Sequence, residues 1–406
     1  MPAAKKKPRI LVILSDGTSN EIKAERSNVL RLFQSVDTAA NDVVFYDPGV
    51  GTVGAYDNWN RWWVRAKEFL GLAFGMGLDD NVLDAYQFLI DNWRKGDRIF
   101  LFGFSRGSYT VRVLAGLIYT VGILSPEQAN LKRYALNTLK TSSISGDFEN
   151  LKIYQETLNR KHVEIEYLGI WDTVSSVFLW IRGMFRIKNI GYSRRNHAVK
   201  TVRHALAIDE RRRFFVQYDW LPDQKHTTHL PHTKEFREGV FPQQDVKEVW
   251  FAGVHADVGG GYRDENSRVP KIALEWMARE ALLAGLPLDQ KKLSRFLGQI
   301  PDENGNYLSK PDPTAPLSNS LTFAWWIIEL WPKWKNFSWS KPASWLDFHI
   351  PLGERRKLSN FNAKDDAKIL IHDTVKTRQE KTVYNPPNFP DENRIKWVST
   401  PPPPKT

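Results

Sequence analysis

The first third of the chain repeats one arrangement three times: a continuous apolar run leads directly into a glycine-containing loop. The runs span residues 9–15, 42–47 and 97–102, and their loops read DGTSN, PGVGT and GFSRG. Such runs of β-branched and aromatic residues are typical of strands buried on both faces, as in parallel sheets. Helix-length stretches lie between or before the runs, at residues 29–39, 59–71 and 81–93, and Asn81 is a candidate N-cap. The pattern predicts an α/β fold, α/β-hydrolase-like, with a mostly parallel sheet and helices on both faces.

Two further strand-like runs, at residues 163–173 and 246–255, each end in polar residues. In an open parallel sheet the ligand site lies beyond the carboxyl ends of the strands. We therefore expect all five runs to bring their loops to one edge of the sheet. Residues 204–215 (HALAIDERRRFF) read instead as an amphipathic, structural stretch.

Composition restricts the chemistry at that edge. The chain of 406 residues has no cysteine, which excludes disulfides, thiolate catalysis and cysteine-bound zinc. Its net charge of +11 suits an anionic membrane surface, and no nucleic-acid signature is present, so no nucleic-acid partner is expected. No segment approaches the about 18 apolar residues of a membrane-spanning helix. With no secretory signal visible, we expect cytoplasmic synthesis, followed by signal-independent export to act at a membrane.

Gly103-Phe104-Ser105-Arg106-Gly107 matches the pattern G-x-S-x-G, directly after one strand-like run and before a helix-like run. In a nucleophile elbow, a serine occupies a strained strand-to-helix turn, and the flanking glycines let strand and helix pack closely. The pattern in this setting predicts that Ser105 is a catalytic nucleophile.

A serine nucleophile needs a base that is oriented by a third group, and in α/β hydrolases the chain order is Ser, acid, His. Asp172 and His255 follow two of the predicted strands in this order. Asp257, two residues from His255, is the alternative acid. His372, which also ends a strand-like run, is the alternative base. His255 is favoured because a Gly-Gly-Gly turn follows it, as in a loop that folds back over a site.

The transition state also needs an oxyanion hole. One donor is expected to be the backbone N–H of Arg106, and the other an N–H of Gly17 or Thr18 in the first glycine loop. Asp16 is expected to hydrogen-bond the backbone of its own loop. A triad of this kind needs no cofactor or metal. His226, His229 and His232 have a metal-like spacing, but the prolines around them and the lack of a carboxylate in step indicate a surface loop.

Several long motifs in the same order carry a resemblance to a known family. They include SDGTSN, YDPGVGT, the stretch around GFSRGSYTVRVLAGLIYTVG, GIWDTV and VWFAGVHADVGGGY. Over residues 10–285, with a further segment at 371–390, the chain resembles the type VI secretion phospholipase effector-like family. The resemblance implies an α/β-hydrolase fold, a triad at Ser105, Asp172 and His255, and phospholipase A activity on membrane glycerophospholipids. It also implies an immunity or secretion-carrier protein as partner. Antibacterial members are often longer, with a separate membrane-anchoring module.

Three segments, at residues 58–78, 177–188 and 321–346, mix Trp, Phe and Leu with Lys and Arg. That mixture suits a bilayer interface, and it equally suits aromatic cores beneath a solvated basic face. We predict a catalytic core over residues 1–285. A Trp-rich, helical or loop-like region over 286–390 is expected to pack on the core as a lid or as a membrane- or partner-facing surface, and a flexible proline-rich tail is expected over 391–406. The predicted function is a serine-dependent lipolytic ester hydrolase of the phospholipase A type. The alternatives are a carboxylesterase on a soluble ester and a dormant hydrolase fold used for binding.

Overall fold

The computed structural model describes most residues of the chain. They are 8–17, 25–38, 42–49, 77–145, 149–158, 161–174, 178–181, 184–187, 192–212, 215, 217–221, 224–321, 333–334, 348–349, 353–358 and 368–403.

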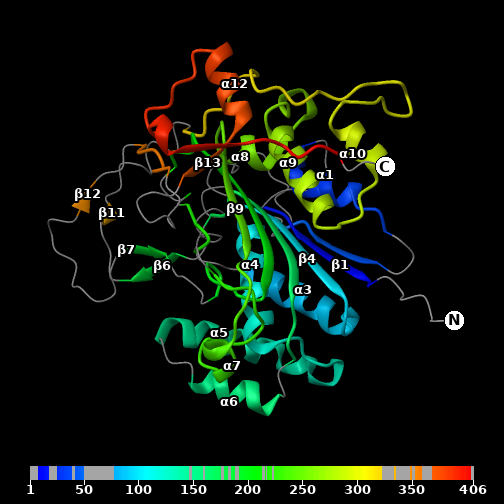
Figure 1. Ribbon diagram of the computed structural model, residues 1–406, viewed down its shortest axis with the longest axis vertical. Helices are drawn as coiled ribbons and strands as arrows, with labels where there is room; N and C mark the ends of the chain where they lie inside the picture. The colour runs from blue at the N-terminus through cyan, green and yellow to red at the C-terminus, as the bar shows by residue number, and fades with distance from the viewer. Residues whose placement is uncertain are drawn as a thin grey trace, which may run out of the picture.

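The centre of the molecule is one eight-stranded sheet, with strand order β14-β13-β9-β8-β5-β4-β1-β3 (Figure 1). Every neighbouring pair in it is parallel. The strands are β1 (Ile10–Ser15), β3 (Val43–Asp47), β4 (Arg98–Phe104), β5 (Ile165–Trp171), β8 (Val199–Ala207), β9 (Asp245–Phe251), β13 (Ile369–His372) and β14 (Ile395–Val398). The predicted α/β class with a parallel sheet is confirmed, and all carboxyl ends of the strands meet at one edge.

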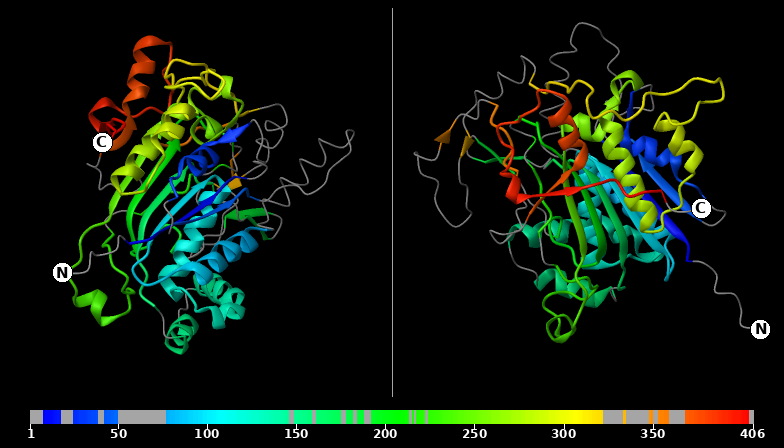
Figure 2. Two further views of the ribbon diagram at one scale, coloured as in Figure 1. Left: turned by 90° about the vertical axis from the view of Figure 1, so that its right-hand side faces the viewer. Right: turned by 45° about the horizontal axis from the view of Figure 1, so that its top comes forward.

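Helices cover both faces of this sheet, as Figure 2 shows. On β1, Leu11 and Ile13 pack into the core under α3 (Leu78–Asn92), α4 (Arg106–Val121), α5 (Lys132–Ser145) and α6 (Glu149–Thr157). Val12 and Leu14 point to the opposite face, where they join the core under α1 (Asn28–Ser35), α9 (Pro270–Leu283) and α10 (Gln290–Phe296). Because successive side chains of a strand alternate between faces, a strand buried on both sides must be apolar throughout.

The remaining described elements are short. They are α7 (Lys234–Glu238), α8 (His255–Gly259), α12 (Asp373–Lys381), η1 (Pro126–Leu131), η2 (Asp264–Asn266), η4 (Glu392–Arg394), and the antiparallel pairs β2 (Arg26–Ser27) with β10 (Gly260–Tyr262), β6 (Phe178–Ile181) with β7 (Met184–Ile187), and β11 (Lys333–Trp334) with β12 (Phe348–His349). In the part of the chain that the structure describes, no single helix is both long and apolar enough to span a bilayer. The predicted helix at 59–71 lies outside the described residues, as do most of segments 58–78 and 321–346.

The structure corrects the predicted organisation of the C-terminal part. Strands β13 and β14 belong to the same sheet as β1, so these two segments are part of the core sheet itself rather than of a helical or loop-like region packed on it. Leu286 and Leu293 lie in the same apolar cluster as Val12, and the core therefore continues across residue 285. Residues 395–398 form β14, so the prediction of a flexible tail from residue 391 is wrong there.

Two local predictions also differ from the structure. Helix α3 begins one turn earlier than expected, with Gly77 rather than Asn81 at its N-cap. The Asn81 side chain instead donates to Asp47 Oδ2 at 2.8 Å and ties the helix to the end of β3. The stretch that read as amphipathic contains the end of β8, a central strand.

Candidate active site

Ser105 lies on the sharp turn between β4 and α4. Its φ of 57° and ψ of −118° fall outside the regions that residues other than glycine usually adopt. Among the described residues other than glycine, three have positive φ, and two of these are Ser105 and Asp172. The Ser105 N–H donates to Trp171 O at 3.1 Å, which ties the turn to the end of β5. Strained backbone of this kind clusters at functional sites, because the surrounding structure must hold it in place.

The flanking glycines are required by close backbone contacts. A Cβ on Gly103 would lie 2.5 Å from Gly107 O, and a Cβ on Gly107 would lie 2.0 Å from Ser15 O. The first turn of α4 therefore packs directly against both its own preceding strand and the end of β1. Ser108 Oγ adds hydrogen bonds to Gly103 O at 2.7 Å and Trp171 O at 3.0 Å.

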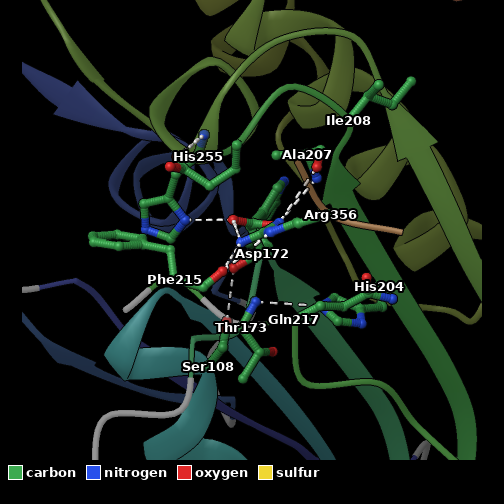
Figure 3. Close-up of polar contacts among 12 residues, drawn as sticks. Ser108, Asp172, Thr173, His204, Ala207, Ile208, Phe215, Gln217, His255 and Arg356 are labelled. Atoms are coloured by element: carbon green, nitrogen blue, oxygen red, sulfur yellow. Dashed lines mark hydrogen bonds and ion pairs between the residues drawn. The ribbon is translucent and has the colours of Figure 1, made fainter. Parts of the chain in front are cut away.

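The structure brings Asp172 and His255 together. His255 Nδ1 lies 2.5 Å from Asp172 Oδ2, although the two residues follow different strands (Figure 3). Rings flank the imidazole on two sides, with centroid distances of 4.7 Å to Phe104 and 4.8 Å to Phe215. Since Phe104 directly precedes Ser105, the imidazole lies beside the elbow.

Electrostatics fix the protonation of this pair. Burial alone would raise the pKa of the Asp172 carboxyl, but the Arg356 guanidinium and His255 hold that pKa well below its usual range. Burial lowers the pKa of His255 from its usual 6.5, against the opposing effect of Asp172. At neutral pH the pair is therefore a carboxylate and a neutral imidazole. With its Nδ1–H donated to Asp172, the imidazole keeps the lone pair on Nε2, as a general base requires.

Two residues that contact this pair were not predicted from the sequence. Arg356 donates to both carboxylate oxygens of Asp172, from a segment far along the chain. Glu210 Oε2 accepts the backbone N–H of His255 at 3.1 Å and fixes the start of α8. Glu210 comes soon after β8, and recognising that strand would have placed it at the carboxyl edge; Arg356 has no such local signal.

The alternative acid and base have other partners. The Asp257 carboxylate accepts the backbone N–H groups of Val254 and Ser318, both at 3.0 Å. His372 is the N-cap of α12, and its ring nitrogens lie 2.8 Å and 3.0 Å from the hydroxyls of Thr374 and Thr400. Burial lowers the pKa of His372 to about 4. The geometry therefore favours Asp172 and His255 as acid and base.

Of the two described N–H groups predicted to form the oxyanion hole, only one lacks an acceptor within its own segment. The Arg106 N–H begins α4, where the first-turn N–H groups have no acceptor within the helix. The Gly17 N–H donates to the Asp16 carboxylate at 2.7 Å, so this donor already has an acceptor. Tyr46 OH donates to the other oxygen of Asp16 at 3.0 Å. Thr18 lies outside the described residues.

No described part of the chain gathers three or more His, Asp or Glu side chains in a geometry that could hold a metal ion. Within the HTTHLPH stretch, His226 lies 3.8 Å from Glu164, and His229 packs against the His162 ring at 5.1 Å.

Comparison with known proteins settles the family. The profile of the type VI secretion system (T6SS) "Phospholipase effector Tle1-like, catalytic domain" matches residues 9–280. The chain belongs to this family. The resemblance predicted from the motifs is thus confirmed, and the chain carries a phospholipase-effector-like catalytic domain.

Similar proteins in this comparison are longer than the present chain. The uncharacterized protein YEL023C of Saccharomyces cerevisiae is 30% identical over 227 residues, which are 52% of this chain and 33% of the yeast protein. A crystal structure of an uncharacterized Pseudomonas aeruginosa protein shares 18% identity, covering 69% of this chain and 47% of the other, with a TM-score of 0.37. The Tle1 effector bound to the VgrG spike of the type VI secretion system shares 18% identity, covering 64% and 52%, with a TM-score of 0.31. The chain thus spans about a third of the yeast relative and about half of each solved chain.

Proposed function

We propose that this chain is a serine-dependent lipolytic hydrolase, a phospholipase A that cleaves acyl esters of membrane glycerophospholipids. The observation that carries the proposal is the buried contact of 2.5 Å between His255 Nδ1 and Asp172 Oδ2, beside the strained turn at Ser105. Membership of the phospholipase effector family supports a lipid ester as the substrate class. A secretion-carrier or immunity partner stays a prediction from the family resemblance, and signal-independent export stays an expectation from the sequence.

The proposed reaction has two half-reactions. His255 Nε2 takes the proton of the Ser105 hydroxyl while Ser105 Oγ attacks the acyl carbonyl carbon. The resulting oxyanion accepts the Arg106 N–H. Of the two second donors predicted from the sequence, the Gly17 N–H already has an acceptor, which leaves the Thr18 N–H for this role. When the bond to the glycerol oxygen breaks, the imidazolium gives its proton to that oxygen and the lysophospholipid leaves. In the second half-reaction His255 Nε2 takes a proton from water as the water oxygen attacks the acyl carbon. The bond to Ser105 Oγ then breaks, the imidazolium returns its proton to Oγ, and the fatty acid leaves.

Asp172 acts in both steps through its charge. Because its pKa is held below the usual range, the carboxylate stays ionised while the imidazolium forms and disappears. A fixed carboxylate at Nδ1 orients the ring and stabilises the imidazolium without itself taking a proton.

The basic charge of the chain favours an anionic bilayer over a small soluble ester as the natural substrate. The net charge is +11, and each cationic side chain near an anionic surface contributes about 1 kcal/mol of attraction. A lipolytic enzyme that binds an anionic surface is expected to hydrolyse aggregated lipid faster than monomeric lipid, whereas a soluble carboxylesterase is not.

The test follows fatty-acid release from a short-chain anionic phospholipid across its critical micelle concentration. We expect the rate to rise sharply once aggregates form, and Ser105→Ala to stay at background throughout. A rate that saturates smoothly with monomeric substrate, and does not respond to aggregates, would favour the soluble carboxylesterase instead.

A further inference from the structure

The acid of the candidate triad is held by a residue well beyond the matched catalytic domain. The family profile ends at residue 280, whereas Arg356 lies in the described segment 353–358. Its Nη1 lies 2.5 Å from Asp172 Oδ1 and its Nη2 lies 3.1 Å from Asp172 Oδ2 (Figure 3). Such a two-pronged guanidinium–carboxylate pair is stronger and more directional than a single contact.

Arg356 is also anchored to the walls of the site. Its Nε and Nη2 donate to Phe215 O at 3.1 Å and 2.7 Å, and the Phe215 ring contacts the His255 ring. Its own carbonyl oxygen accepts Asn388 Nδ2 at 2.9 Å, and the same amide group donates to Ile208 O at 3.1 Å. Through its guanidinium and its backbone carbonyl, Arg356 therefore connects the acid, the residue beside the imidazole and the C-terminal part of the chain.

We propose that Arg356 is a positioning residue of the triad, which fixes the Asp172 carboxylate against His255 Nδ1. The C-terminal part is then a component of the catalytic unit, rather than a lid or docking region added to a complete one. The inference rests on the proposed function, because it presumes that Ser105, Asp172 and His255 act together.

The hydrogen bonds to the carboxylate support a positioning role. Without Arg356, the described donors to Asp172 are His255 Nδ1 on Oδ2 and the Ala207 N–H on Oδ1 at 3.1 Å. Two donors, one on each oxygen, hold a carboxylate plane less firmly than four. A buried ion pair is by itself weak evidence of a net gain in stability, so its value here is in fixing the carboxylate.

The charge of Arg356 has a second consequence, for the pH dependence of the base. Asp172 faces Arg356, His255 and His204, whereas His255 faces Asp172, Glu210 and Arg212. Arg356 offsets part of the Asp172 charge, so its removal strengthens the attraction between the carboxylate and a protonated imidazole. The pKa of His255 should then rise. Since the base must be neutral, activity would be lost at a higher pH than in the natural chain.

The experiment measures the rate at which a fluorophosphonate probe labels Ser105, from about pH 4 to about pH 9. Arg356→Ala should lower this rate roughly 10- to 100-fold, move its acid limb to higher pH, and recover in part with added guanidinium ion. Arg356→Lys keeps the charge but not the two-pronged geometry, so a smaller loss is expected. Arg355→Gln is the matched control: Arg355 pairs with Asp209 at 3.1 Å, and its loss should leave rate and acid limb unchanged.

The outcomes separate the inference from the proposed function. If Arg356→Lys labels at the natural rate with the natural acid limb, the inference is overturned, whether or not Arg356→Ala folds. A folded Arg356→Ala with a lower rate, an unmoved acid limb and no recovery by guanidinium would also overturn it and leave only a structural role. If the natural chain is not labelled at Ser105 at all, the proposed function itself fails.

Discussion

His255→Ala is expected to lower kcat about a million-fold, the loss seen when the base of a serine hydrolase triad is removed. The imidazole acts in both half-reactions, as base toward Ser105 and then water, and as acid toward the leaving alcohol. Its ring nitrogen Nδ1 lies 2.5 Å from Asp172, a carboxylate whose pKa is held well below its usual range and which is therefore a poor substitute base. The measurement is single-turnover hydrolysis of an activated ester by the folded variant.

His372→Ala provides the matched control, since His372 is the rival base in the sequence. It caps α12 and contacts the Thr374 and Thr400 hydroxyls. Loss of such a cap costs about 1 kcal/mol of the free energy of unfolding, and kcat should stay within about 3-fold. If His372→Ala abolished hydrolysis while His255→Ala retained it, the assignment of the base would be wrong.

Asp172→Asn is expected to lower kcat about 10,000-fold, as when the acid of such a triad becomes an amide. The amide cannot hold the imidazole in the tautomer with its lone pair on Nε2, nor stabilise the imidazolium. The change also leaves Arg356 buried without its counter-charge, so a lower free energy of unfolding is expected alongside. Kinetics at the pH plateau and denaturant unfolding measure the two effects separately.

Asp257→Asn tests the alternative acid. Asp257 accepts the backbone N–H groups of Val254 and Ser318, and one amide oxygen can replace part of that role. We expect reduced stability with less than about a 10-fold change in kcat, because the imidazole keeps its own carboxylate. A loss in kcat as large as that of Asp172→Asn would place Asp257 in the triad instead.

The parts of the site that the sequence predicted are those with a local pattern. The elbow can be predicted from the sequence because both glycines lie within one five-residue motif between a strand and a helix, although Gly107 packs against Ser15, which is distant in sequence. The positions of Asp172 and His255 could be predicted because parallel strands end at one edge of the sheet, and each of the two residues follows such a strand. Whether the two side chains meet then depends on the order of the strands in the sheet. The alternation of strands and helices indicates a parallel sheet in which both residues lie at the same edge.

The parts that escaped prediction depend on partners distant in sequence. Strand β8 contains Arg203 and His204, charged or polar residues that suggest an exposed face. Both are buried: Arg203 Nε lies 2.6 Å from Glu280 Oε2, and His204 Nδ1 lies 2.8 Å from Glu248 Oε1. Burial of such groups is tolerated only because these partners satisfy them, and no local pattern reveals that.

Strand β14, the place of β13 in the central sheet and Arg356 were missed for a related reason. Strand β14 has only four residues within a proline-rich stretch, and this composition does not predict a strand. Pairing with β13 at the edge of the sheet stabilises it as one. Arg356 is one of many arginines in a basic chain, and only the folded structure brings it to Asp172.

The most direct test of the account is fatty-acid release from mixed anionic phospholipid vesicles by the natural chain and by Ser105→Ala. Equal unfolding midpoints would show that the two proteins are equally folded. We predict that the natural chain releases fatty acid and lysophospholipid, and that Ser105→Ala releases them only at the background rate. Release that persists in the folded Ser105→Ala variant, or no release by the natural chain, would contradict it.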